Sequence, residues 1–114
     1  MKENKLIDLS MEVAIIIVKF CDNIKGHSSV VNQLSRCGTS VGANIHEANY
    51  AQSKADFVHK LQIALKECYE TEYWLELLLK SDIIEEGKYK DIKSRYGTIR
   101  RMLIASINTV KQGK

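Results

Sequence analysis

The sequence has 114 residues, 45% of them hydrophobic and 27% charged, which is enough for one domain with a single packed core. It has no proline and only six glycines, which disfavours a fold of many short strands, and its longest uncharged apolar run, residues 13–18, is too short to span a bilayer. The net charge is +3, but residues 1–86 hold 9 basic against 13 acidic side chains, whereas residues 87–114 hold 8 against 1.

The first predicted helix starts at residue 5 or 8 and runs to residue 24. Apolar residues recur there at steps of three and four, the spacing of one helical face. They are Leu9, Val13, Ile16, Ile17, Phe20 and Ile24. Gly26 then accepts the left-handed conformation that follows a helix end.

The second predicted helix is capped by Ser28 and Ser29 and runs to about residue 50. Its apolar face is formed by Val30, Leu34, Cys37, Val41, Ile45 and Ala48. Gly38 and Gly42 lie four residues apart in this helix, where each costs about 1 kcal/mol relative to alanine. Such a cost predicts that another element packs tightly against them.

Two longer helices are predicted in the second half of the chain. Ser53 and Asp56 resemble a capping box and start a helix that reaches about residue 80. Its inward residues are Phe57, Leu61, Ala64, Cys68, Leu75 and Leu79. A last helix covers residues 85–111, with Tyr89, Ile92, Tyr96, Ile99, Leu103, Ile107 and Val110 inward. Because the connections are short, we expect a single domain over residues 1–114, an all-α, antiparallel, up-down-up-down four-helix bundle.

Two of the predicted helices carry a second set of apolar residues outside the main stripe. The set consists of Met11, Ile15, Val18, Ile63, Trp74 and Leu77. Soluble monomers rarely expose such patches, so these residues predict an interface between subunits. The alternative is that a long helix buries a broad face within its own chain.

The sequence offers little for metal binding or catalysis. The three histidines are not paired at helical spacing, Cys-x-x-Cys and Glu-x-x-His are absent, and no nucleophile elbow or phosphate-binding glycine loop occurs. The scattered cysteines Cys21, Cys37 and Cys68 are typical of reduced core thiols, and the chain begins without a signal-peptide pattern. We therefore expect a cytoplasmic protein with no cofactor, no metal, no enzymatic activity and no membrane association.

Several polar residues lie beside the predicted core. Arg36, Ser40 and Glu47 lie on one flank of the second helix, and Asn44 lies at the edge of its apolar face. Polar groups so placed predict a buried or interfacial hydrogen-bond network. Glu72 points close to the core on the third helix and needs a partner, either Arg36 or a base of the last helix.

The last helix carries a basic ridge, formed by Lys90, Lys93, Arg100, Arg101 and Lys111 within about 100° of one another. A row of cations suits a phosphate backbone and predicts RNA or DNA binding. Two alternatives remain open: carboxylates of the neighbouring helix neutralise the ridge, with Lys90 and Lys93 near Glu72 and Glu76, or the ridge meets an acidic protein.

A family resemblance rests on four segments: RCGTSVGANIHEA at 36–48, SKADF at 53–57, IALKE at 63–67 and EYWLELL at 72–78. They resemble the four-helix-bundle family encoded in intervening sequences of bacterial 23S rRNA genes, often labelled a ribosomal protein. The matching positions are Arg36, Ser40, Asn44, Glu47, Ser53 and Phe57. Gly42 stands where many relatives carry proline, and Ala48 stands where many carry glycine.

The resemblance also implies partners. The family is similar to the accessory protein of diversity-generating retroelements, which forms a pentameric barrel and binds nucleic acid and a reverse transcriptase through a basic surface. It thus implies a homopentamer with RNA or DNA, and a protein such as a reverse transcriptase, as partners. We expect a non-enzymatic, homo-oligomeric nucleic-acid-binding protein; the alternative is a structural or protein-interaction module that binds no nucleic acid.

Overall fold

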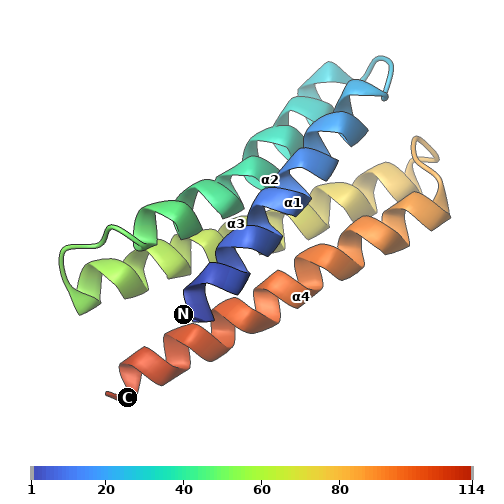
Figure 1. Ribbon diagram of the computed structural model, residues 1–114. Coiled ribbons are helices and arrows are strands. Elements are labelled where there is room, and N and C mark those ends of the chain that lie inside the picture. Colours follow the sequence, from blue (N-terminus) through green and yellow to red (C-terminus); the bar gives the residue numbers. More distant parts are fainter. Residues whose placement is uncertain (1, 114) are drawn as a thin grey trace.

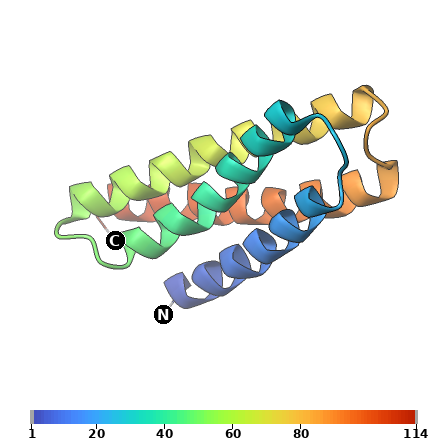
Figure 2. The ribbon, with the colours of Figure 1, turned by 90° about the horizontal axis from the view of Figure 1, so that it is seen from above.

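Four long helices account for nearly all of residues 2–113, the part of the chain that this computed structural model describes: α1 (Lys2–Asp22), α2 (Ser28–Ala48), α3 (Lys54–Lys80) and α4 (Glu86–Lys111). Consecutive helices run antiparallel, and α1 also packs against α4 (Figure 1). In consequence α1 and α3 lie diagonally across the bundle, as do α2 and α4 (Figure 2). The predicted all-α, up-down-up-down four-helix bundle is confirmed, with extents of 45 × 20 × 19 Å.

The helix ends show how local sequence sets the turns. The predicted N-cap of α3 is confirmed, because Ser53 Oγ accepts from the Asp56 N–H at 3.0 Å. The return bond of a capping box is shifted by one residue, since the Asp56 carboxylate accepts from the Gln52 N–H at 3.3 Å and not from Ser53. The predicted caps Ser28 and Ser29 are wrong, because His27 occupies the N-cap position of α2 and makes no side-chain capping bond. The chain turns there through two left-handed residues, Gly26 and His27, with φ of 78° and 55°.

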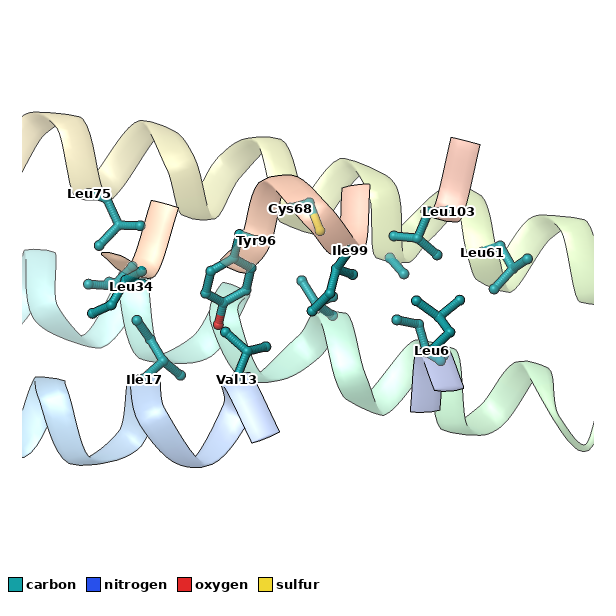
Figure 3. Close-up of a cluster of buried hydrophobic side chains, with 14 of the residues drawn as sticks. Leu6, Val13, Ile17, Leu34, Leu61, Cys68, Leu75, Tyr96, Ile99 and Leu103 are labelled. Carbon is teal, nitrogen blue, oxygen red and sulfur yellow. The ribbon is translucent and has the colours of Figure 1, made fainter. Parts of the chain in front are cut away.

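The core lies along the middle of all four helices. Its largest fully buried side chains include Ile17, Leu34, Leu61, Leu75, Ile99 and Leu103. Tyr96 extends from α4 through this core toward α1 and α2 (Figure 3). Its hydroxyl donates to the Gly38 carbonyl of α2 at 3.0 Å, so the one polar atom of this ring is satisfied inside the bundle.

Two inward residues were predicted one position off. Val31 is buried in α2 where Val30 was expected, and Leu78 is fully buried in α3 where Leu79 was expected. Both alternatives fit the spacing of one helical face, since Val31 and Val30 lie three and four residues before Leu34, and Leu78 and Leu79 lie three and four residues after Leu75. Periodicity alone therefore does not separate the two positions.

The glycine pair of α2 confirms the predicted close approach. A Cβ at Gly38 would lie 2.8 Å from the Tyr96 hydroxyl and 3.1 Å from Ile17. A Cβ at Gly42 would lie 3.2 Å from the backbone oxygen of Ser10 in α1. The two missing side chains therefore let α1 and the Tyr96 ring of α4 approach α2.

No helix among residues 2–113 combines the length and the apolarity that crossing a membrane requires.

Candidate nucleic-acid interface

The orientation of α4 places the basic ridge on its α3 side. The buried residues Ile92, Tyr96, Ile99, Leu103 and Ile107 fix the rotation of the helix. At 100° per residue, all members of the ridge then lie on the flank that faces α3 and solvent. Lys90, Lys93, Arg101 and Lys111 are exposed, and Arg100 is partly buried between the two helices.

Arg100 is the ridge residue that α3 neutralises. Its Nε donates to Glu72 Oε2 at 2.8 Å, and its guanidinium carbon lies 5.7 Å from the centre of the Tyr69 ring. The hydrogen bond and the nearby carboxylate raise the pKa of Arg100. The sequence left Arg36 and a basic residue of α4 open as partners of Glu72, and the structure shows that the partner is Arg100 of α4.

The other ridge residues have weaker partners or none. Lys90 pairs with Glu86 of its own helix at 3.1 Å, with both side chains exposed, and Lys93 lies 5.5 Å from the Tyr89 ring centre. Lys90 and Lys93 form no direct ion pair with Glu72 or Glu76, which pair with Arg100 and Lys80 instead. Lys93 is nevertheless close enough to feel both carboxylates: contact with Tyr89, and then the charges of Glu72 and Glu76, raise the pKa of Lys93.

Arg101 and Lys111 form no ion pair with any side chain of residues 5–113, and the same holds for Lys93. Arg101 Nη2 lies 3.4 Å from Thr98 Oγ1, a long contact to a neutral hydroxyl. Four of the five ridge cations therefore form no direct ion pair with another helix within residues 5–113.

The predicted ridge left out two basic residues of α4, Lys88 and Arg95. Arg95 lies on the opposite flank, where it pairs with Glu12 of α1 at 3.0 Å and with Asp91 at 3.3 Å. The four-residue step from Asp91 to Arg95 was a usable signal for the local pair. The pair with Glu12, 83 residues away, had no such signal.

Within the described residues, the polar side chains of α2 have separate partners and do not form one hydrogen-bond network. Arg36 binds Glu70 at 2.8 Å, and Glu47 binds Lys60 at 2.9 Å, so each bridges α2 to α3. Asn44 donates to the backbone oxygen of Ser40 at 2.9 Å within its own helix.

Glu70 is the centre of a small polar cluster on the outside of α3. The indole N–H of Trp74 donates to its Oε2 at 3.0 Å, and this bond together with Arg36 lowers the pKa of Glu70. Arg36 also lies 3.6 Å from Glu67 Oε1, a buried atom that has no hydrogen-bond partner within residues 2–113.

The predicted interface residues lie on two separate surfaces. The α1 strip consists of Met11, Ile15 and Val18, whose exposed fractions are 60%, 49% and 41%. The α3 patch consists of Ile63, Trp74 and Leu77, all partly buried, beside the exposed Tyr73. Because α1 and α3 are diagonal in the bundle, the strip and the patch face different directions.

Each of the two surfaces borders a shallow groove. A groove of about 320 Å³ runs between α1 and α2 and is lined by Met11, Ala14 and Ala43 among others. A second groove, of about 270 Å³, lies on α3 and is lined by Tyr73 and Leu77.

The cysteines are buried and un-ionised. Burial raises the pKa of Cys21 and Cys37 to about 11 and that of Cys68 to about 12, which leaves them poor nucleophiles at neutral pH. Within residues 2–113, no group of three or more histidine, cysteine or acidic side chains is placed to hold a metal ion.

Comparison with known proteins gives a family and a close structural relative. The sequence profile of the 23S rRNA-intervening sequence protein family matches residues 2–105. The crystal structure of a protein with unknown function from the S23 ribosomal protein family of Bacteroides thetaiotaomicron VPI-5482 is similar, with a TM-score of 0.89 and 44% sequence identity. The similarity covers 95% of this chain and 99% of that one. No curated protein matches the chain.

Proposed function

The chain belongs to the 23S rRNA-intervening sequence protein family, and from its surface we propose that it is a non-enzymatic, homo-oligomeric protein that binds nucleic acid through the basic ridge of α4. The family match and the relative of unknown function support the fold and do not assign a role. The similarity to the retroelement accessory protein stays an expectation, as does a reverse transcriptase partner.

The observation that carries the proposal is the shortage of carboxylates around the ridge. Within residues 5–113, Arg100 is the one ridge residue with an ion pair to another helix, and the pair of Lys90 with Glu86 is fully on the surface. Exposed pairs of this kind contribute about 0–1 kcal/mol, so a phosphate group can displace them at little cost. The ridge thus presents positive charge that the chain does not neutralise internally.

The dimensions of the ridge fit an extended polyanion. Lys90 and Lys111 are 21 positions apart on one straight helix, which corresponds to about 31 Å. Cations spread over this length contact several successive phosphates, and each contact releases condensed counterions. Affinity from this source does not depend on base sequence.

Self-assembly through the α1 strip and the α3 patch is the second part of the proposal. Two different surfaces that face different ways favour a head-to-tail contact, in which the strip of one copy meets the patch of the next. Contacts of this type close into rings when the rotation between copies permits, and a ring repeats the ridge around its axis. A homopentamer agrees with this arrangement.

Charge reversal tests the role of the ridge. We expect Arg100→Glu with Arg101→Glu to abolish the binding of labelled RNA or DNA oligonucleotides in fluorescence anisotropy. Because Arg100→Glu breaks the pair with Glu72, a second variant, Lys93→Glu with Arg101→Glu, reverses two residues that have no ion pair among residues 5–113.

Lys19→Glu with Lys25→Glu is the matched control, since it makes the same charge change on exposed lysines of α1 and the following turn, which are not members of the ridge. Equal loss in the control and both ridge variants would refute a specific role for the ridge, and unchanged tight binding in the ridge variants would refute nucleic-acid binding through α4.

A protein-interaction module remains the second candidate, because the exposed α1 strip suits a protein partner as well as another copy. Material purified from its own cells distinguishes the two. Nucleic acid that co-purifies with the wild type, but not with the Lys93→Glu, Arg101→Glu variant, supports the first. A stoichiometric protein partner with no nucleic acid supports the second.

A further inference from the structure

Gly97 is an unusual residue for its place in α4. It is buried although it lies on the ridge side of the helix, and a glycine within a helix costs about 1 kcal/mol relative to alanine. Two arginine side chains shield Gly97 from solvent, because a Cβ at this position would lie 3.4 Å from Arg100 Nη2 and 3.4 Å from Arg101 Nη1. Two guanidinium groups therefore meet above a stretch of bare backbone.

The charges around Gly97 do not balance. Glu72 engages Arg100 through Nε, whereas the Nη2 atom of Arg100 faces the glycine. Arg101 adds a second positive charge, and its one polar side-chain contact in the described part of the chain is the Thr98 hydroxyl at 3.4 Å. Two adjacent guanidinium groups with one carboxylate between them present spare N–H donors, and such donors fit the oxygens of a phosphate group.

An exposed aromatic ring stands beside these donors. Tyr69 projects from α3 with the Arg100 guanidinium over one face of its ring, and 53% of its surface is exposed. In a duplex the faces of the bases are covered by stacking, but unpaired bases stack readily on aromatic side chains next to a cationic groove. The combination of Tyr69 with the arginine pair thus favours an unpaired nucleotide over a base pair.

We propose that Gly97, Arg100, Arg101 and Tyr69 form a site for one nucleotide of a single strand, with its phosphate on the two guanidinium groups and its base on the Tyr69 ring. This inference rests on the proposed function and specifies its substrate as single-stranded RNA or DNA. The ring and the arginines come from different helices, so the packing of α3 against α4 creates the site.

The test compares single-stranded RNA, single-stranded DNA and duplex DNA of one sequence in fluorescence anisotropy. We expect the wild type to bind at least one of the single strands at least about tenfold more tightly than the duplex. Tyr69→Ala is expected to weaken single-strand binding by about 5- to 100-fold and to leave duplex binding unchanged, while Tyr69→Phe keeps the affinity of the wild type. Tyr50→Ala is the control, because Tyr50 is an exposed tyrosine at the end of α2, away from the ridge.

Gly97→Ala gives an independent readout. A Cβ at this position would contact both guanidinium groups at 3.4 Å and fill the space between them and the backbone, so we expect weaker single-strand binding together with equal or higher thermal stability. A purely structural role for Gly97 predicts lower stability and unchanged affinity. Equal binding of single strand and duplex, unaffected by Tyr69→Ala, would overturn this site and leave the proposed function standing. No binding of any nucleic acid would overturn both.

Discussion

At the scale of single residues, the clearest link between sequence and packing is the contact of Gly38 with Tyr96. The tyrosine hydroxyl lies so close to the glycine that no side chain fits between them, and its hydrogen bond uses the carbonyl of the same glycine. The two residues are 58 positions apart, so the sequence indicated a close approach at Gly38 but not which side chain makes it.

Replacing Gly38 with alanine should destabilise the protein by about 1–3 kcal/mol, because the new Cβ overlaps the Tyr96 hydroxyl in a packed core. Denaturant unfolding monitored by circular dichroism measures the loss. The matched control is Gly87→Ala, which meets nothing within 4 Å near the start of α4 and should stabilise by about 0.5–1 kcal/mol.

Adding Tyr96→Phe to Gly38→Ala should recover part of the loss, because the nearest atom is gone and Ile17 is the remaining contact. A double variant that is as unstable as the sum of the two single variants would contradict this account of the contact.

The buried thiols and Tyr96 make stability depend on alkaline pH. Burial raises the pKa of Cys21 and Cys37 from 9.0 to about 11 and that of Cys68 to about 12, and it raises the pKa of Tyr96 as well. Above pH 9 the unfolded chain therefore loses these protons before the folded chain does. The free energy of unfolding should be at its full value below that pH and should fall as the pH rises toward 11 or 12. Urea midpoints measured at constant ionic strength that do not change over this range would contradict the burial of these groups.

At the scale of helices, periodicity predicted the existence and order of all four elements, because each buries a stripe at steps of three and four residues. The ends were harder to predict. The start of α2 depends on the left-handed backbone of His27, and no side-chain cap marks that position. The ridge could be predicted because each residue of an α-helix is rotated by about 100° from the one before it. The pairing of Arg100 with Glu72 could not, because it depends on how far α4 is shifted along α3.

The pair of Glu72 with Arg100 should restrain binding while it stabilises the bundle. Glu72→Gln removes the charge that holds Arg100, so we expect a loss of about 1 kcal/mol in unfolding free energy and a higher affinity for single-stranded oligonucleotides. Glu76→Gln is the control, since it removes the same charge from an exposed pair with Lys80 on the same helix. If both variants change affinity equally, net charge and not the release of Arg100 explains the effect.

At the scale of the whole molecule, the bundle has more apolar surface than one copy buries. The α1 strip and the α3 patch lie on different sides of a narrow rod of 45 × 20 × 19 Å, and three large apolar side chains of α1 are exposed. The sequence indicated that one core cannot bury all of these apolar residues. Their division into two surfaces depends on which helices lie diagonally across the folded bundle.

A charge in the α1 strip should prevent assembly. We expect wild-type protein to have the mass of an oligomer in light scattering and Ile15→Glu to have the mass of a monomer with unchanged helix content, because a buried unpaired carboxylate is costly. Gln52→Glu adds the same charge in the α2–α3 turn and should leave the oligomer intact. A wild type that stays monomeric at high concentration would contradict self-assembly.

The central claim is that α4 offers uncompensated positive charge to a nucleic acid, and the salt dependence of binding tests it most directly. Affinity for a single-stranded oligonucleotide should fall linearly on a log–log plot against salt concentration, with a slope of about −2 to −3 per protomer if three or four ridge cations each contact a phosphate. Reversal of Lys93 and Arg101 should reduce that slope by about half. A slope near zero, or one that the reversal leaves unchanged, would show that the ridge is not the binding surface.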